Sequence, residues 1–328
     1  MALSKRAALW QHDRWNLSPT RVGGRGMPLA DAADLRWKRQ SRAVLKAMEG
    51  MFDVVLPLRE GGPGATLFCV PPVGGLSWGF HQLLTALPPD CNVYGLQSRG
   101  LTRPEPLPTS MAELARDFAD QVCRVQPQGP YFLLGWSVGG NVAYSMAREL
   151  EARGHEVGLL ASMDASPSFD PASFDAEPDA WFYYNIVLDS FGYPALLRQG
   201  DPEPEASALA LIRRRPNLVL STWSDDEIRR LLQVIVNNVA IARADVRPPG
   251  MLRCPVLLFA ATGTEQEPST AEKTESWRAV THGPVEVIEL DCKHQHMLLP
   301  EPMAIIGAAL TRRLSAASRT ASPSPAEP

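Results

Sequence analysis

A serine in a glycine-rich turn is the residue of this chain best suited to chemistry. The motif Gly135-Trp136-Ser137-Val138-Gly139 follows an apolar run, Tyr131–Leu134, and opens a helical pattern that extends to about Arg153. A tight turn from strand to helix leaves little room for side chains two residues on either side of the serine, and it lifts the hydroxyl above the sheet. The first helical amide, that of Val138, would then face an oxyanion forming beside the serine. The motif therefore indicates that Ser137 is a nucleophile.

A serine hydroxyl is a weak nucleophile at neutral pH, so it needs a base, which an acid in turn orients. The chain has six histidines, and two of them, His294 and His296, come just after the apolar run Val285–Leu290. In this architecture the base follows the last strand. We favour His294 because it lies closer to the end of that strand, and we expect His296 to be a packing or surface residue.

Two strand ends could supply the acid. Asp164 directly follows the apolar run Gly158–Met163, whereas the later run Pro255–Ala261 is followed by two glutamates, Glu265 and Glu267, and by no aspartate. A short carboxylate at the end of a strand is held more rigidly than a glutamate in a loop. We therefore favour Asp164, although an Asx turn at a strand end is an alternative use of the same residue.

A second oxyanion donor is expected from the loop after the first apolar run of the main body. That loop reads Pro71-Pro72-Val73-Gly74-Gly75. The prolines fix the backbone and remove competing amides, and the glycines allow the backbone to approach a substrate closely. The amide of Val73 is the natural candidate.

Short apolar runs alternate with helical patterns along residues 54–314. This alternation predicts an α/β fold, in which a mostly parallel sheet is covered by helices on both faces. Such sheets carry their sites at the carboxyl ends of the strands, where Ser137, Asp164 and His294 all fall. The apolar runs are Ala65–Val70, Asn92–Gln97, Tyr131–Leu134, Gly158–Met163, Pro255–Ala261 and Val285–Leu290.

Composition excludes several classes of protein. The 328 residues are 45% hydrophobic and 21% charged, with a formal net charge of −4, which argues against a disordered chain and against nucleic acid as the main partner. No apolar run is long enough to cross a bilayer, and the N-terminus lacks the apolar core of a signal peptide, so we expect no membrane role and a cytoplasmic location. The five cysteines form no C-x-x-C pair, which predicts neither a metal site nor a disulfide framework.

Three further segments are distinguished by composition and length. Residues 1–53 form a basic extension or linker, whose first 50 residues hold ten Lys and Arg against four Asp and Glu and include a plausible helix, Asp31–Met48. A docking role toward an acidic carrier is one hypothesis for it, and a solvated basic helix is the other. Residues 166–250, part of a gap of about ninety residues between strand candidates, predict a helical lid. Residues 315–328 are rich in Ser, Ala and Pro and predict a disordered tail.

Four segments together resemble the thioesterase domains of non-ribosomal peptide synthetases, above all the releasing domain of enterobactin-type siderophore synthetases. They are Leu67–Gly75, Tyr94–Gly100, Gly129–Tyr131 and Gly135–Ser137. The later segment Asp291-Cys292-Lys293-His294 is similar to the last motif of that family. The resemblance covers about residues 54–312 and implies an α/β-hydrolase fold with a helical lid.

The resemblance also implies a reaction. Ser137 would carry an acyl-enzyme, loaded from the phosphopantetheine thioester of an acyl or peptidyl carrier protein and released by hydrolysis or macrocyclisation. It assigns Asp164 as the acid, His294 as the base, and the amides of Val73 and Val138 as the oxyanion hole, with no cofactor and no metal. A separate editing thioesterase, a small-ester hydrolase with the same triad, and a non-catalytic scaffold that binds a carrier remain as alternatives.

Overall fold

The computed structural model describes residues 52–167, 179–193, 196–216, 218–245, 250–263 and 268–320. Nearly all of the basic extension, including its expected helix Asp31–Met48, lies outside these residues, as do Glu265, Glu267 and residues 321–328. The chain divides into two compact units. The larger unit contains residues 52–169 and the chain from residue 233 onward, and the smaller one contains residues 170–232 together with the first 51 residues.

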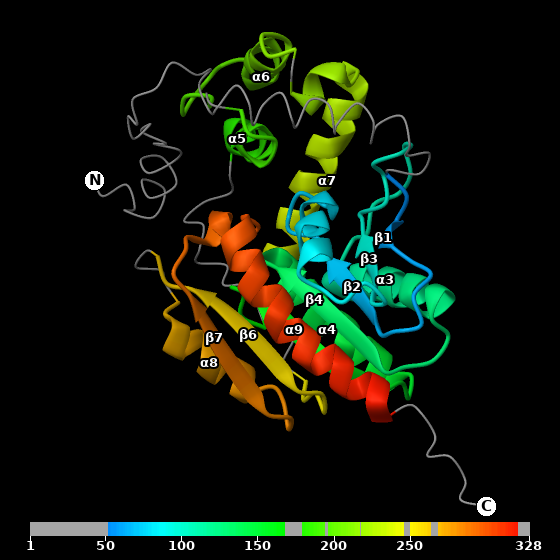
Figure 1. The fold of residues 1–328 in the computed structure, drawn as a ribbon. Helices are drawn as coiled ribbons and strands as arrows, with labels where there is room; N and C mark the ends of the chain where they lie inside the picture. Colours follow the sequence, from blue (N-terminus) through cyan, green and yellow to red (C-terminus); the bar gives the residue numbers. More distant parts are fainter. Residues whose placement is uncertain are drawn as a thin grey trace, which may run out of the picture. The chain divides into compact units, whose positions relative to one another are not determined.

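A seven-stranded sheet forms the centre of the larger unit, with the strand order β1-β3-β2-β4-β5-β6-β7 among the described residues (Figure 1). The pair β1 and β3 is antiparallel, and every other neighbouring pair is parallel. The strands are β1 Val55–Arg59, β2 Thr66–Val70, β3 Asn92–Leu96, β4 Tyr131–Trp136, β5 Val157–Met163, β6 Val256–Ala261 and β7 Val285–Leu290. The six parallel strands match the six apolar runs to within two residues at each end.

The antiparallel strand β1 has no counterpart among the apolar runs expected from the sequence. It lies at the edge of the sheet and contains Pro57, which pairs with Tyr94 of β3. Proline cannot donate to a neighbouring strand, and an edge position tolerates it because one side of the strand needs no partner. Because a proline within a run of residues argues against a strand, the sequence pattern does not predict β1.

Helices cover both faces of this sheet (Figure 1). On one face, α3, α4 and α8 enclose a hydrophobic core that includes Phe68, Tyr131 and Trp277. On the other face, η1 and α9 enclose a second core that includes Phe80 and Phe259. The described helices that lie wholly in the larger unit are η1 Trp78–Thr85, α3 Met111–Val125, α4 Val138–Ala152, α8 Thr270–Arg278, η4 His294–His296 and α9 Pro300–Thr320.

In its described part, the regular secondary structure of the smaller unit is helical. It contains α5 Ala180–Ser190, α6 Pro204–Arg213, η3 Val219–Thr222 and the first turns of α7 Asp225–Ala244. Glu205 joins three of these elements in one network, because its carboxylate accepts from the Tyr184 hydroxyl at 3.2 Å and from Arg229 Nε at 2.7 Å. The second half of α7 belongs to the larger unit, so the segment 166–250 is not one structural body.

The C-terminal boundary differs from the expected one. Helix α9 continues to Thr320, although we expected a disordered tail from Ser315 onward. Alanine favours a helix, and the first proline of this stretch is Pro323, so nothing in residues 315–320 ends the helix.

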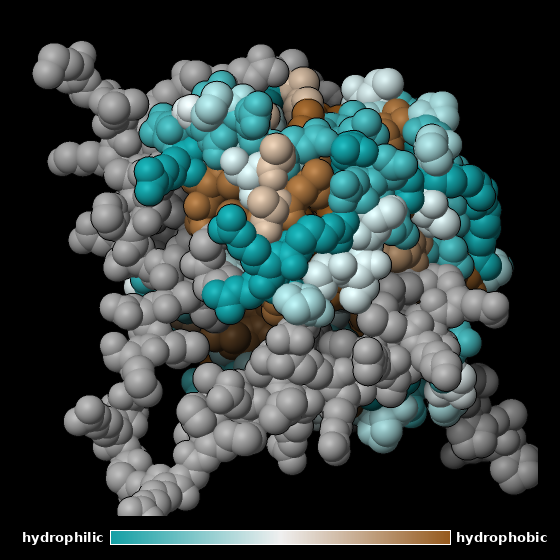
Figure 2. Space-filling view, turned by 90° about the horizontal axis from the view of Figure 1, so that it is seen from above, coloured by the Kyte–Doolittle hydropathy of each residue, from teal (hydrophilic) through white to brown (hydrophobic). Residues whose placement is uncertain are grey.

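Hydrophilic side chains dominate the described surface seen in Figure 2. The exposed large hydrophobic residues are Val236, Met251, Leu299 and Ile305. In the described part of the chain, no helix combines the length and the hydropathy that a membrane crossing requires.

Candidate active site

Ser137 occupies the turn between β4 and α4. Its backbone has φ 56° and ψ −130°, a conformation that L-residues rarely adopt. The turn is crowded: a Cβ added at Gly135 would lie 2.1 Å from the carbonyl oxygen of Gly139, and one added at Gly139 would lie 2.4 Å from the carbonyl oxygen of Pro71. Both glycines of the motif are therefore required by packing, as the sequence predicts for a strand-to-helix turn that presents a serine.

Asp164 and His294 meet at the carboxyl ends of their strands. His294 Nδ1 lies 2.7 Å from Asp164 Oδ2, and the side chain of Asp164 is fully buried while that of His294 is 25% exposed. A hydrogen bond from Nδ1–H to the carboxylate leaves Nε2 as the acceptor nitrogen of a neutral ring. The structure thus joins Asp164 and His294, the acid and base that the sequence favours.

The His294 ring also packs beside the serine turn. Its centroid lies 5.7 Å from the ring of Trp136, the residue that precedes Ser137. Among the described residues, no hydrogen bond joins the Ser137 hydroxyl to His294. In enzymes without a bound substrate such contacts are often long and tighten only in the reacting complex.

Opposing effects act on the pKa of Asp164. Burial raises it, but the hydrogen bond and charge of His294, together with those of Lys273, outweigh burial and hold the pKa below its usual value. The carboxylate therefore stays ionised at neutral pH. Burial and the nearby charge of Asp164 raise the pKa of the Cys292 thiol to about 11, so this neighbouring cysteine remains a thiol and does not compete as the nucleophile.

The loop that carries Val73 is held in place by two other segments. Gly75 N donates to Pro72 O at 2.9 Å, and Ser98 N, just beyond β3, donates to Gly75 O at 2.9 Å. From α7, Asn238 Nδ2 donates to Val73 O at 2.9 Å. A Cβ on Gly139 would touch Val70 O and Pro71 O, so this loop lies against the first turn of α4, which begins at Val138. The two expected oxyanion amides thus come from segments in contact with each other.

Asn238 is a residue that the sequence does not single out, and we expect its side chain to support the oxyanion loop. Replacing it with leucine removes the donor to Val73 O while keeping a similar volume. We expect the rate of acyl transfer to Ser137 to fall about tenfold, less than the loss of an oxyanion donor itself. The rate is measured with a small acyl thioester, and Asn237→Leu is the matched control, because Asn237 donates to Pro108 O instead. Equal losses in the two variants would contradict the assignment.

Lys273 is a second residue that the sequence does not single out. Its Nζ lies 2.7 Å from Asp164 Oδ1, and its side chain is almost fully buried. Three other described histidines lie elsewhere: His81 Nδ1 contacts Trp78 O, the His155 ring packs against Tyr131, and His282 donates its backbone amide to Leu252 O.

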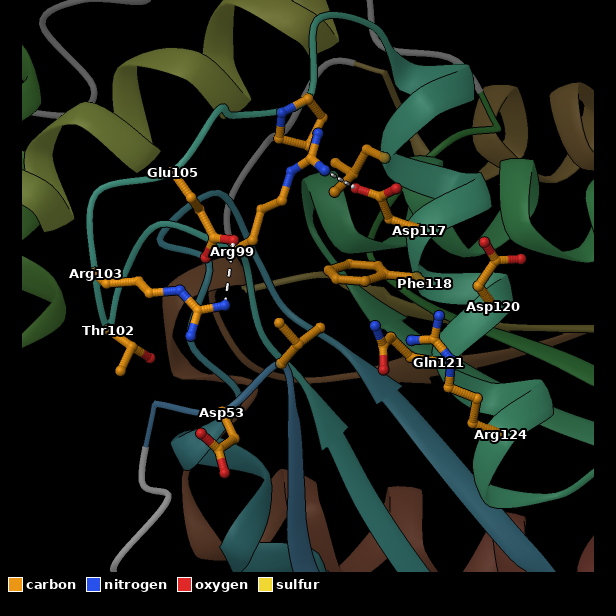
Figure 3. Close-up of a pocket in the computed structure, with 13 residues that line it drawn as sticks. Asp53, Arg99, Thr102, Arg103, Glu105, Asp117, Phe118, Asp120, Gln121 and Arg124 are labelled. Carbon is orange, nitrogen blue, oxygen red and sulfur yellow. Dashed lines mark ion pairs between the residues drawn. The ribbon is translucent and has the colours of Figure 1, made fainter.

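A cavity of about 380 Å³ lies between α3 and the segment that follows β3 (Figure 3). Charges of both signs line it, including an ion pair between Arg99 and Asp117. None of Ser137, Asp164 and His294 contributes to its walls. Within the described ranges, no group of three His, Cys, Asp or Glu side chains is arranged to hold a metal ion.

A family model for the thioesterase domain matches residues 65–309. A dimodular nonribosomal peptide synthase of Bacillus subtilis (strain 168) is 36% identical over 274 residues, which cover 83% of this chain and 11% of that protein. Enterobactin synthase component F of Escherichia coli (strain K12) is 28% identical over 267 residues, which cover 80% of this chain and 18% of that protein. The chain thus spans less than a fifth of the length of these relatives.

Solved structures show the same fold. The chain superimposes on the Vlm2 thioesterase domain, bound with a dodecadepsipeptide, with a TM-score of 0.60 and 21% identity, over 80% of this chain and 98% of that one. It superimposes on holo-AB3403, a four-domain nonribosomal peptide synthetase, with a TM-score of 0.71 and 20% identity, over 83% of this chain and 21% of that one. The family match covers well over half of the sequence, and the sheet carries the serine turn and the acid–base pair where an α/β hydrolase has them. This chain therefore belongs to the thioesterase domain family.

Proposed function

We propose that this enzyme is a serine thioesterase that releases an acyl or peptidyl chain from the phosphopantetheine thioester of a carrier protein in non-ribosomal peptide biosynthesis. The observation that carries the proposal is the 2.7 Å contact between His294 and the buried Asp164, beside the strained turn of Ser137. The names of the relatives, which are peptide synthetases, support the substrate class.

The first half of the reaction forms an ester on the enzyme. The Oγ of Ser137 attacks the thioester carbonyl carbon while His294 Nε2 accepts its proton. The amides of Val73 and Val138 donate to the oxyanion of the tetrahedral intermediate. The carbon–sulfur bond then breaks, and the phosphopantetheine sulfur leaves with the proton from His294. Asp164 holds the ring in the required tautomer and stabilises its protonated form.

The second half releases the chain. A water molecule, or a hydroxyl or amine of the chain itself, gives its proton to His294 and attacks the ester carbonyl. The bond to Ser137 Oγ breaks, and the oxygen regains a proton from His294. Water yields a free acid, and an internal nucleophile yields a macrocycle.

Two further elements complete the proposal. The helical unit of residues 170–232 acts as a lid that limits the access of water to the ester, which decides between hydrolysis and cyclisation. A carrier protein is the partner that delivers the substrate. The lid rests on the size and separate packing of the smaller unit, and the carrier protein rests on the similarity to peptide synthetases.

The proposal is tested by mixing the purified protein with carrier proteins that bear different acyl thioesters and following enzyme and product by intact mass spectrometry. We expect an acyl adduct on the enzyme that is absent in Ser137→Ala, with turnover reduced at least about 10³-fold in the variant. The mass of the product, larger or smaller by one water, separates hydrolysis from cyclisation.

Other outcomes would change the assignment. Turnover of oxygen esters without turnover of carrier thioesters would identify a small-ester hydrolase with the same triad. Binding of the carrier without any adduct, across varied acyl groups, would favour a non-catalytic scaffold. Adduct formation that persists in Ser137→Ala would contradict the nucleophile.

A further inference from the structure

A buried lysine completes the surroundings of the acid. The side chains of Lys273 and Asp164 are 5% and 0% exposed, and Lys273 Nζ lies 2.7 Å from Asp164 Oδ1. The same oxygen accepts from the backbone amide of Ala261 at 3.1 Å. Because Oδ2 accepts from His294, the carboxylate lies between a lysine on one oxygen and the proposed base on the other.

Helix α8 is built to hold this lysine in position. Ser269 and Glu272 form a capping box at its start, which fixes the first turn that carries Lys273. One turn further along, Trp277 Nε1 donates to the carbonyl oxygen of Ala165 at 2.7 Å, and the Trp277 side chain is completely buried. Residues four apart lie on one helix face, so α8 contacts the Asp164–Ala165 turn with two donors, of which only one is charged.

The charge of Lys273 has two effects on the pair. It helps to keep Asp164 ionised inside the protein, where an unpaired carboxylate would be costly. It also opposes a positive charge on His294, because the two cations would share one carboxylate. Only a neutral His294 can accept the proton of Ser137, so the second effect favours the reactive state of the enzyme at lower pH.

We propose that Lys273 is a positioning residue for the Asp164–His294 pair and that its charge sets the pH range in which His294 acts as the base. The inference rests on the proposed roles of these two residues and of Ser137. Among the described residues, the titratable groups placed around Asp164 are Lys273 from α8 and, from the segment after β7, His294 and Cys292, which has Asp291 beside it. Cys292 is a neutral thiol near neutral pH, so Lys273 is the basic group, besides His294, that the structure shows in contact with Asp164.

The test measures how Ser137 reacts with a fluorophosphonate at different pH values, since this reaction needs no knowledge of the natural acyl group. The bond from Ser137 Oγ to phosphorus forms, fluoride leaves, and His294 takes the proton. The second-order rate constant is followed by intact mass spectrometry from pH 5 to pH 9. The proteins compared are the wild type, Lys273→Met, Lys273→Gln and Trp277→Phe.

Lys273→Met and Lys273→Gln both remove the positive charge of the ammonium group, and the glutamine amide keeps a hydrogen-bond donor for Asp164. We expect both to move the midpoint of the acidic limb upward by about one pH unit, the size typical of one nearby charge. At pH 6 their rate constants would then fall about tenfold further than at pH 9. Trp277→Phe removes the other donor from α8 without changing any charge, and we expect its midpoint to match that of the wild type.

A structural role alone would give a different result. All three variants are expected to unfold at lower temperatures, so thermal unfolding cannot replace the pH profile. A midpoint that stays at the wild-type value in both lysine variants, or that moves equally in Trp277→Phe, would overturn the role of the charge. Wild-type protein that is not labelled at Ser137 would overturn the proposed function itself, and with it this inference.

Discussion

Replacement of His294 by alanine is expected to reduce the rate of acyl transfer to Ser137 by about 10⁶-fold, the loss typical of removing the base of such a triad. Without the ring, the serine proton has no acceptor beside the turn, and the Asp164 carboxylate loses the partner bound to Oδ2. The amides of Val73 and Val138 remain, so a slow residual reaction is expected. Single-turnover acylation by a thioester, followed by intact mass spectrometry, measures the effect directly.

His296→Ala is the matched control for this experiment. His296 lies two residues further along, in the same short helix η4, but the hydrogen bond to Asp164 comes from His294. We expect His296→Ala to retain the wild-type rate within about twofold, as surface and packing substitutions away from the reacting atoms usually do. A large loss in His296→Ala together with near-normal His294→Ala would contradict the choice of base.

The residues of the proposed triad could be predicted because each one lies within four residues of the end of a strand. Ser137, Asp164 and His294 come after the strands β4, β5 and β7, and in a parallel sheet the carboxyl ends of all such strands lie at the same edge. Knowledge of the strands therefore brings together residues that are 130 positions apart in the chain, as Asp164 and His294 are. The Asp164–His294 contact in the structure is the outcome that this reasoning predicts.

The supporting residues could not be predicted in the same way. Lys273 contacts Asp164 across 109 positions and Asn238 contacts Val73 across 165, and both lie within helices. Their contacts depend on how α8 and α7 pack against the sheet, which no local pattern encodes. A lysine in a short polar helix is most often a solvated residue, and its burial here is a tertiary effect.

The boundaries differ from expectation for local reasons. The edge strand β1 contains a proline, which argues against a strand in the sequence pattern, and a stretch rich in alanine extends α9 past Ser315. The expected lid runs to residue 250, whereas the division into two units falls inside α7, after Leu232. A helix with one unbroken apolar pattern gives no sign of such a boundary. The part of α7 in the larger unit supplies Asn238, which donates to Val73 O.

Among glycine-to-alanine substitutions at the site, we expect Gly135→Ala to cause the largest loss of stability. The new Cβ would lie 2.1 Å from Gly139 O and 2.7 Å from Gly140 N, both of them backbone atoms at the start of α4. Backbone at this point cannot move aside without separating α4 from β4. We expect a loss of about 3 kcal/mol or more in the free energy of unfolding, measured by urea denaturation, because overpacking against backbone leaves no rotamer to adjust.

Gly74→Ala provides the matched control, since a Cβ at Gly74 meets nothing within 4 Å, and we expect its stability to stay within about 0.5 kcal/mol of the wild type. The comparison also bears on activity. Ser137 keeps its unusual φ of 56° only because the surrounding turn imposes it. Any Gly135→Ala protein that still folds would have relaxed this turn, so its acylation rate should fall even where folding is complete. Full stability and a normal acylation rate in Gly135→Ala would mean that the turn is far more compliant than its packing implies, and that the strained serine is not needed for the reaction.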